Sequence, residues 1–241
     1  MRKRADLVLV ELGLFPTRAR AQAAIAAGLV SVDGAVVAKS SENIDPSARI
    51  EASAPHPWVS RGGVKLAAAL EEFALDPNGL ACLDVGASTG GFTDVLLARG
   101  ARRVVAVDVG HGQLDPRLRA DPRVVALENA DARQLTPAML GEPPQAIVCD
   151  VSFISLRLVL PPVLALAAKP AWLVALIKPQ FEAGRENLVK GAVKDPAIHA
   201  RVCDEIRDCV ENLGWTSVGL IASPIAGGDG AREFLYAARH E

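Results

Sequence analysis

The sequence predicts an α/β fold, with a mostly parallel seven-stranded sheet preceded by a small α+β unit. Two observations predict the sheet: apolar runs alternate with helical stretches from about Val59 onwards, and a glycine-rich turn follows the first of these runs. Continuous apolar strands separated by helices are typical of a parallel sheet that is covered on both faces. The chain has 241 residues, which is enough for one medium domain and one small domain.

The small unit, residues 1–52, begins with two short helices. Apolar residues at helical spacing predict the first helix over 4–12. Thr17 is a suitable N-cap for the second helix, over 18–27, because its hydroxyl can accept a hydrogen bond from the first turn. The segment 29–37 predicts two short strands joined by an Asp-Gly turn, which is a strong hairpin signal.

The larger domain is predicted over 60–241, after a proline-containing linker over 53–59. A helix over 63–73 opens this domain. The predicted strands are 81–85, 104–107, 124–128, 146–149, 172–177, 216–221 and a last one near 234–237. The further predicted helices are 93–99, 156–168 and 196–213.

The charge of the chain is nearly balanced, with a formal net charge of −2. The chain is therefore not a globally basic nucleic-acid coat, and contact with RNA phosphates must come from local clusters of lysine and arginine. The first twenty residues contain such a cluster, against only Asp6 and Glu11: Arg2, Lys3, Arg4, Arg18 and Arg20. This cluster favours an RNA-contacting surface on the small unit.

The cysteines and the apolar segments argue against a metal site and against a membrane protein. None of the four cysteines lies in a Cys-x-x-Cys pair, and no histidine spacing matches a zinc site. We therefore expect no metal and reduced thiols, as in a cytoplasmic protein. No signal peptide is visible. The longest apolar stretch, 158–168, contains two prolines and is too short to span a bilayer.

A glycine-rich turn, Gly86-Ala-Ser-Thr-Gly-Gly91, connects the first strand of the sheet to the next helix. Glycines in this place let the backbone turn tightly and approach a ligand closely, as in Rossmann-like nucleotide sites. Asp108, after the second strand, is suited to bind ribose hydroxyls, and Asp131, after the third, is suited to accept from an adenine amino group. The residues expected to contact the cofactor are Asp84, Gly86, Ala87, Ser88, Gly90, Gly91, Phe92, Asp108, Val109 and Asp131.

The spacing and charge of this turn favour S-adenosylmethionine over a dinucleotide. A dinucleotide site prefers Gly-x-Gly-x-x-Gly, which seats a pyrophosphate at the helix N-terminus. Here the spacing is Gly86-x-x-x-Gly90-Gly91. Asp84 lies just before the turn, where its charge would repel phosphates but could hold the amino group of a methionine moiety. This argument disfavours the alternative of a nicotinamide-dependent dehydrogenase.

Four further charged residues lie at the edge where the ligand is expected: Lys65, Asp150, Lys178 and Glu233. Methylation of a ribose 2′-hydroxyl requires removal of a proton from a weak oxygen acid. Burial and a second cation lower the pKa of a lysine, which makes it a usable base near neutral pH. We expect Lys178 to be this base, with Asp150 orienting it. We expect Lys65 to stabilise the alkoxide and Glu233 to hold Lys65 or the ribose.

Methylation of a base fits these residues less well. Amino-group methyltransferases carry an Asp/Asn-Pro-Pro-aromatic motif after the fourth strand, where this chain has Asp150-Val-Ser-Phe153. Methylation of cytosine at carbon 5 needs a nucleophilic cysteine. Cys149 lies within a strand beside an acidic residue, and this environment disfavours a thiolate.

Several blocks of the sequence resemble the TlyA (haemolysin A) family, whose members look like FtsJ-type methyltransferases fused to an S4-type RNA-binding domain. The resemblance implies 2′-O-methylation of cytidine in ribosomal RNA, commonly 23S and in some members also 16S, with S-adenosylmethionine as methyl donor. It also places the Lys-Asp-Lys-Glu tetrad of the family on Lys65, Asp150, Lys178 and Glu233. The matching blocks cover nearly the whole chain and are 59–66, 84–94, 107–114, 150–155, 177–182 and 223–225.

The N-terminal unit resembles the S4 pattern, which implies that arginines of its second helix face RNA phosphates. Two departures from the family concern Ala231, where asparagine is usual, and the segment 56–59, which lacks a basic residue before its Trp-Val pair. The first departure concerns the conformation of the loop before the last strand, and the second concerns the coupling between the domains. Neither changes the residues of the tetrad. The residues expected to contact RNA are Arg4, Arg18, Arg20 and Arg61.

Two other functions stay open at this point. One is a cytolytic protein, which the second name of the family suggests. The other is a non-catalytic RNA-binding factor for ribosome assembly that keeps the cofactor fold. The expected partner is ribosomal RNA, either free or within a ribosomal subunit.

Overall fold

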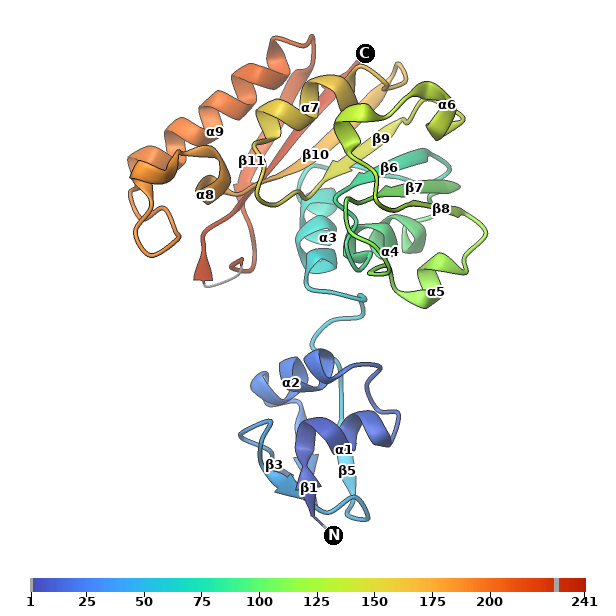
Figure 1. The fold of residues 1–241 in the computed structure, drawn as a ribbon, viewed down its shortest axis with the longest axis vertical. Coiled ribbons are helices and arrows are strands. Elements are labelled where there is room, and N and C mark those ends of the chain that lie inside the picture. The colour runs from blue at the N-terminus through green and yellow to red at the C-terminus, as the bar shows by residue number, and fades with distance from the viewer. Residues whose placement is uncertain (1, 228–229) are drawn as a thin grey trace. The chain divides into compact units, whose positions relative to one another are not determined.

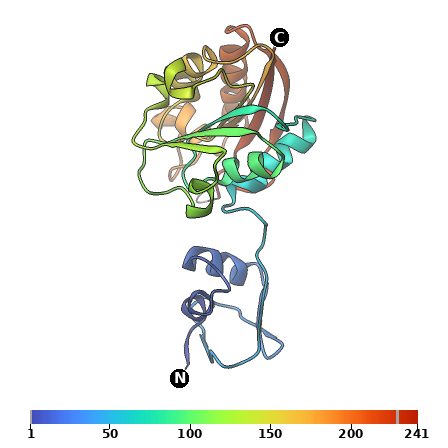
Figure 2. The same ribbon diagram turned by 90° about the vertical axis from the view of Figure 1, so that its right-hand side faces the viewer.

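The computed structural model describes residues 2–227 and 230–241 and divides the chain into two compact units, Met1–Pro57 and Trp58–Glu241. Figures 1 and 2 show that the second unit is a single sheet with helices on both faces. The α/β fold class expected from the sequence is confirmed. No helix among the described residues has the length and apolar character needed to cross a membrane.

The small unit contains both expected helices, α1 (Ala5–Glu11) and α2 (Arg18–Ala26). The Thr17 hydroxyl accepts a hydrogen bond from the Arg20 backbone N–H at 3.4 Å, which is the N-cap expected at this place. The hairpin of the small unit is present, and three further short strands were not expected. The strands are β1 (Lys3–Arg4), β2 (Val30–Val32), β3 (Ala35–Val36), β4 (Asn43–Ile44) and β5 (Ile50–Ala52).

A buried carboxylate holds the two helices of the small unit together. Asp6 on α1 is fully buried and accepts hydrogen bonds from Arg18 at 2.9 Å and from Gln22 at 2.7 Å, both on α2. Arg4 donates two further hydrogen bonds to it, at 3.0 and 3.1 Å. These donors favour the charged carboxylate, and they lower the pKa of Asp6 well below its usual range.

We expect Asp6→Asn to destabilise the small unit by about 2 kcal/mol, because the half-exposed arginines lose the charged acceptor of their hydrogen bonds. Since the pKa of Asp6 is lowered by folding, its contribution is present at neutral pH and is lost as the pH falls through the folded value. Hydrogen exchange of the α1 and α2 amides measures this effect. The exposed pair of Lys3 and Glu11 provides a control, since Glu11→Gln should cost less than about 0.5 kcal/mol.

The large unit has a seven-stranded sheet in the order β11-β12-β10-β9-β6-β7-β8. β12 runs antiparallel to both of its neighbours, and the other pairs are parallel. Every expected strand is present, and the last one is longer than expected. The strands are β6 (Ala81–Val85), β7 (Arg103–Val107), β8 (Val124–Leu127), β9 (Ala146–Cys149), β10 (Ala171–Ile177), β11 (Thr216–Ala222) and β12 (Phe234–His240).

Helices cover the two faces of this sheet (Figures 1 and 2). α3, α4 and α5 pack with one apolar cluster, and α6, α7 and α9 pack with the other. The helices are α3 (Gly62–Glu72), α4 (Gly91–Ala98), α5 (Pro116–Arg119), α6 (Pro137–Leu140), α7 (Leu156–Leu164), α8 (Pro179–Glu182) and α9 (Pro196–Glu211), with short 3-10 turns η1 (Ala132–Gln134) and η2 (Arg185–Asn187).

Helix α7 is shorter than the sequence suggested. We expected it to reach residue 168, and it ends at Leu164. Pro170 disfavours the helical conformation at the residue before it. Ala168 instead donates its backbone N–H to Pro144 at 2.9 Å, in the loop before β9. The chain thereby leaves the helix in time to enter β10.

Candidate active site

The parallel strands of the large unit bring their C-terminal ends to one edge of the sheet, where two pockets open. The smaller pocket has a volume of about 300 Å³ and the larger about 460 Å³. Gly86, Ser88, Asp150 and Ser152 line both pockets, so the two are adjacent. A ligand in the larger pocket therefore lies next to any group bound in the smaller one.

Gly86 makes the close approach between the first and fourth strand ends possible. Its φ of +83° lies in the left-handed region, and a Cβ built on it would lie 2.4 Å from the backbone oxygen of Asp150. Gly90, with a φ of +93°, is the N-cap of α4, and a Cβ there would meet Leu118 at 2.3 Å. The two glycines shape the turn, and Gly90 itself lines neither pocket.

Lys178 and Asp150 form an ion pair in the smaller pocket. The Nζ of Lys178 lies 2.6 Å from Oδ1 of Asp150, and only 11% of the lysine side chain is exposed. The same Nζ donates a hydrogen bond to Oγ of Ser152 at 2.8 Å. Lys178 directly follows β10 and Asp150 directly follows β9, which are hydrogen-bonded neighbours in the sheet. The parallel register thus produces the contact that strand-end positions alone suggested.

Lys65 and Glu233 form a second ion pair at the same pocket, in which Lys65 donates a hydrogen bond to Glu233. Lys65, on α3, lines the pocket, and Glu233 lies behind it just before β12. Both side chains are buried. The four residues expected to form the tetrad are therefore arranged as two lysine–carboxylate pairs around one cavity.

The larger pocket contains the two other strand-end carboxylates. Asp108 accepts the backbone N–H groups of Ser88 at 2.7 Å and Gly110 at 2.6 Å, which hold its carboxylate in place. Asp131 accepts hydrogen bonds from the Arg133 side chain, and these lower the pKa of Asp131. The remaining wall is largely apolar and comprises Val85, Val107, Val109, Ala130, Ala132, Val151, Phe153, Ile154 and Val159.

The residues expected to contact the cofactor are divided between the pockets. Gly86 and Ser88 line both. Ala87, Gly91 and Phe92 line the smaller pocket, and Asp108, Val109 and Asp131 line the larger one. Asp84, like Gly90, is part of neither lining. One ligand could extend through both pockets. Its adenosyl group would fit the larger pocket, and its methyl group would reach the lysines in the smaller one.

Asp84 is fully buried and lies next to the glycine turn in the sequence. It faces α4, where Thr93 donates a hydrogen bond to its Oδ2 at 2.6 Å, while its Oδ1 has no partner among the described residues. Burial, together with the nearby charges of Asp150 and Asp108, raises the pKa of Asp84 to about 7. The carboxyl group therefore connects β6 to α4 through Thr93.

Because the pKa of Asp84 is raised by folding, its stabilising contribution is complete below the unfolded value of 3.8 and is lost as the pH rises through about 7. We expect Asp84→Asn to match the wild type near pH 4 and to be more stable near pH 8, by at most about 4 kcal/mol. Urea unfolding at the two pH values measures the difference. The exposed Asp76→Asn control should leave the pH dependence unchanged.

Sequence reasoning missed Ser152 and Phe153, which follow Asp150 on the loop after β9. Phe153 is 90% exposed, has a φ of +65°, and its ring lies 5.0 Å from that of Phe181. A bulky residue in the left-handed region is rare and marks strain that often accompanies a functional site. Phe153 is revealed only by the exposure of its aromatic ring at the mouth of a pocket. No sequence pattern indicates such exposure.

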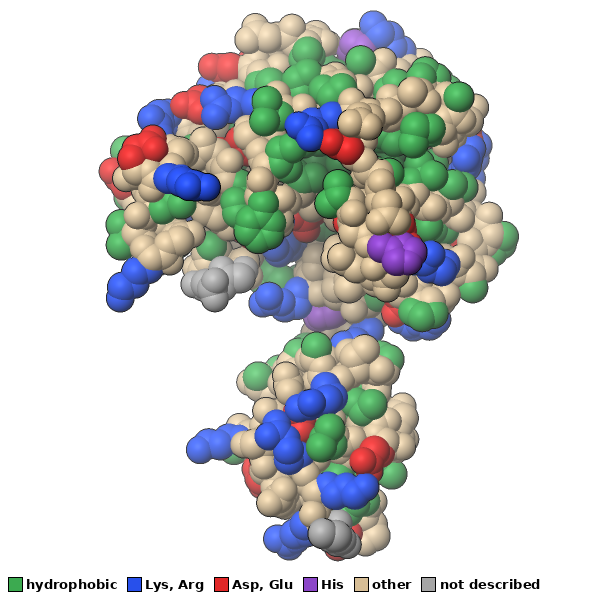
Figure 3. All heavy atoms as spheres, viewed as in Figure 1, with side chains coloured by type: hydrophobic (Ala, Val, Ile, Leu, Met, Phe, Trp, Pro, Cys, Tyr) green, Lys and Arg blue, Asp and Glu red, His purple; other side chains and the backbone are tan. Residues whose placement is uncertain are grey.

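The arginines expected to contact RNA lie in both units. Arg4 and Arg18 each donate to Asp6, although 43% and 52% of their side chains remain exposed. Arg20 is half-buried on α2, and the exposed Arg61 lines the smaller pocket of the large unit. Figure 3 shows Lys and Arg side chains gathered on the visible face of the small unit. Arg4 and Arg18 are thus pre-oriented by Asp6 rather than free on the surface.

Comparison with known proteins identifies both units. Residues 58–240 match the family model of FtsJ-like methyltransferases, and residues 3–50 match that of the S4 domain. A 16S/23S rRNA (cytidine-2′-O)-methyltransferase TlyA from Mycobacterium tuberculosis is 46% identical over 97% of this chain and 88% of its own length.

Two solved structures add to this. A protein described as a hemolysin of Streptococcus thermophilus superposes with a TM-score of 0.79, at 40% identity, covering 99% of this chain and 88% of its own. A magnesium protoporphyrin IX methyltransferase from Synechocystis with bound S-adenosylmethionine has a TM-score of 0.51 at 14% identity, covering 75% of this chain and 80% of its own. The second likeness concerns the fold alone.

Proposed function

This chain belongs to the TlyA family of FtsJ-like methyltransferases, and from that premise we propose that it methylates the ribose 2′-hydroxyl of cytidine in ribosomal RNA. It is an enzyme that uses S-adenosylmethionine, as expected from the sequence. The observation that carries the proposal is the pair of lysine–carboxylate contacts around the smaller pocket, next to the larger pocket that fits an adenosyl group.

Residues of both pockets would bind S-adenosylmethionine. Asp108 would bind the ribose hydroxyls of the cofactor, because two backbone N–H groups already hold its carboxylate and its oxygens can accept further hydrogen bonds. The apolar wall that includes Val109 would contact the adenine, with Asp131 at its edge. The turn from Gly86 to Phe92 would hold the methionine moiety. When bound, S-adenosylmethionine supplies an electrophilic methyl group.

Lys178 is the proposed base. Its amine accepts the proton of the ribose 2′-hydroxyl as that oxygen becomes a nucleophile. Asp150 orients the amine through the 2.6 Å contact. Lys65 places a positive charge in the same pocket, where it stabilises the developing alkoxide, and Glu233 holds Lys65 in place. Most of the rate gain comes from holding the reacting groups in line.

The RNA is proposed to contact both units. The S4 unit would bind phosphates through Arg4, Arg18 and Arg20, since charge-assisted contacts to phosphate oxygens dominate affinity for RNA. Arg61 at the smaller pocket would contact the phosphate beside the target nucleotide. With ribosomal RNA as substrate, alone or within a ribosomal subunit, the enzyme acts in the cytoplasm.

The two other functions considered from the sequence are not favoured. A hemolysin name occurs among the similar proteins, but the family model and the 46% identical relative are those of methyltransferases. A non-catalytic assembly factor would not need two lysine–carboxylate pairs beside a cofactor pocket. These pairs support catalysis over RNA binding alone.

Transfer of a tritiated methyl group to purified ribosomal subunits and to stripped ribosomal RNA tests the proposal. We expect label in RNA, and equilibrium binding of S-adenosylmethionine by the full chain. Binding of the cofactor and of RNA without any transfer would contradict the enzymatic function and favour the assembly factor. Lysis of erythrocytes by protein that transfers no methyl group would favour the cytolytic alternative.

A further inference from the structure

The amine of Lys178 has two close oxygen neighbours, only one of which belongs to the expected tetrad. Oδ1 of Asp150 lies 2.6 Å from Nζ, and Oγ of Ser152 lies 2.8 Å from it. Ser152 lines both pockets, so this hydroxyl lies where the cofactor pocket meets the lysine pocket. The serine is therefore placed to act on the base itself.

A neutral amine has two N–H donors and one lone pair. The contact with Asp150 is an ion pair in which Oδ1 accepts no hydrogen bond from the described residues, so by itself it leaves the amine free to rotate about its last carbon–nitrogen bond. The hydrogen bond to Ser152 removes this freedom. It fixes one N–H, the charge of Asp150 attracts the other, and the lone pair takes the remaining tetrahedral position. We propose that Ser152 is a positioning residue, which together with Asp150 turns the lone pair of Lys178 towards the ribose hydroxyl. The inference rests on the proposed function.

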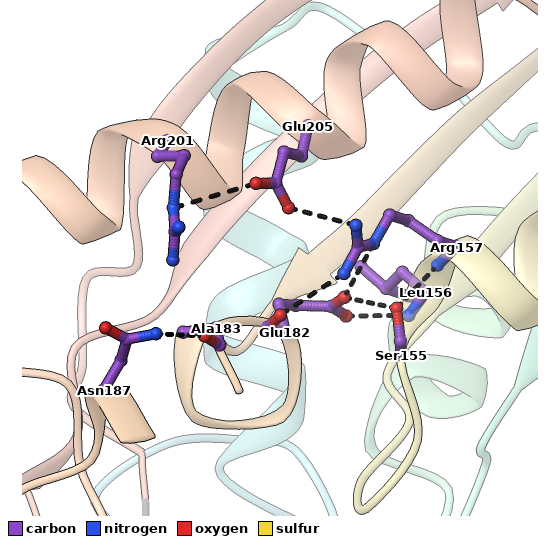
Figure 4. Close-up of polar contacts among 8 residues, drawn as sticks. All are labelled: Ser155, Leu156, Arg157, Glu182, Ala183, Asn187, Arg201 and Glu205. Atoms are coloured by element: carbon purple, nitrogen blue, oxygen red, sulfur yellow. Dashed lines mark hydrogen bonds and ion pairs between the residues drawn. The ribbon is translucent and has the colours of Figure 1, made fainter. Parts of the chain in front are cut away.

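The loop that carries Ser152 is itself held to the segment of Lys178. Glu182, at the end of α8, is buried and accepts hydrogen bonds from Oγ of Ser155 at 2.5 Å and from the backbone N–H of Leu156 at 2.7 Å. Figure 4 shows these contacts, with Arg157 on the same carboxylate and reaching on to Glu205 of α9. The loop after β9 and the segment after β10 are thus joined by the hydrogen bond of Ser152 with Lys178 and by the hydrogen bonds of Glu182. The contacts of Glu182 help to hold Ser152 close to Lys178.

The proton balance of the step is simple. The O–H bond of the ribose breaks, an N–H bond forms at Nζ through the lone pair, and the amine becomes an ammonium group. The ribose oxygen receives the methyl group that the cofactor supplies. The ion pair with Asp150 and the hydrogen bond to Ser152 persist through the step, so neither oxygen has to move. The new N–H occupies the direction in which the substrate oxygen lay.

Steady-state methyl transfer by the full-length Ser152→Ala variant tests this inference. We expect kcat to fall up to about 10-fold, the loss of one oriented hydrogen bond between neutral groups, while KM for RNA and the unfolding midpoint stay at wild-type values. Ser152→Thr keeps the hydroxyl and should restore kcat. Ser217→Ala is the matched control, because Ser217 has two hydrogen bonds of its own on β11 and lines neither pocket.

A double variant shows whether the serine acts through the lysine. In a Lys178→Met background, Ser152→Ala should cause no further loss of the residual rate, because there is no amine left to orient. A full 10-fold loss in that background would overturn the inference, and so would a wild-type kcat for Ser152→Ala. In either case, ribose methylation by the wild type would still support the proposed function. Absence of ribose methylation by the wild type would overturn both.

Discussion

Replacing Lys178 with methionine is expected to lower kcat for methyl transfer by about 10²–10⁴-fold, the usual contribution of a positioned base. Methionine keeps the length and the apolar character of the side chain but has no amine to accept the ribose proton. Because Lys178 lines only the smaller pocket, Kd for S-adenosylmethionine should change little. Rapid mixing with saturating RNA and cofactor measures the rate of the chemical step.

Lys169→Met is the matched control for this variant. Lys169 is exposed and precedes β10, whereas Lys178 follows the end of that strand, so the two lysines lie at opposite edges of the sheet. The control should retain the wild-type rate. A Lys178→Met enzyme that keeps its rate within a few-fold of the wild type would exclude Lys178 as the base.

Removal of one member of the buried pair of Lys65 and Glu233 is expected to have the second large effect. Glu233→Met leaves the ammonium of Lys65 buried without its counter-charge, which should cost about 3–5 kcal/mol of unfolding free energy. Methyl transfer should also fall, because Lys65 is no longer held at the pocket. The three tryptophans of the chain lie in the large unit, so urea unfolding followed by their fluorescence reports on this unit.

The double variant Lys65→Met, Glu233→Met separates stability from chemistry. Replacing both charges with apolar side chains should restore most of the unfolding free energy, since well-packed apolar residues often substitute for a buried ion pair without loss. Activity should stay low, because the positive charge near the alkoxide is absent. Recovery of wild-type activity in the double variant would show that the pair is needed for folding alone.

The contact between Asp150 and Lys178 could be predicted because it follows from the order of the strands. Asp150 and Lys178 each directly follow an apolar run, and a parallel sheet brings such positions to one edge. The pairing of Lys65 with Glu233 joins residues 168 positions apart. Their separation in the sequence does not indicate that they are in contact. The contact arises because β12 pairs with β10 and α3 packs against β12.

The role expected of Asp84 shows what a position at a strand end does not reveal. Asp84 lies in β6 between Leu83 and Val85, and successive side chains of a strand point to opposite faces. Leu83 and Val85 belong to the cluster beneath α7 and α9, so Asp84 faces α4 and Thr93 instead. The alternation of the strand contains the direction of this side chain, which the glycine motif alone does not give.

Contacts of the small unit were beyond prediction for a different reason. Arg4 and Arg18 are expected from the sequence to contact RNA, and no pattern indicated that both also bind the buried Asp6, which is 12 positions from Arg18. The two-residue strands β1 and β4 also form only by pairing with each other. Such short segments have no periodicity of their own, and tertiary contacts decide their structure.

The most direct test of the central claim is the position of the methyl group on the modified nucleoside. Ribosomal RNA treated with the wild-type enzyme is digested to nucleosides, and mass spectrometry breaks the bond between base and sugar. We expect the methyl group to stay with the ribose of a cytidine and Lys178→Met to remove this product. A methyl group that stays with the base would rule out ribose methylation, because no proton of a sugar hydroxyl would then have reached Lys178.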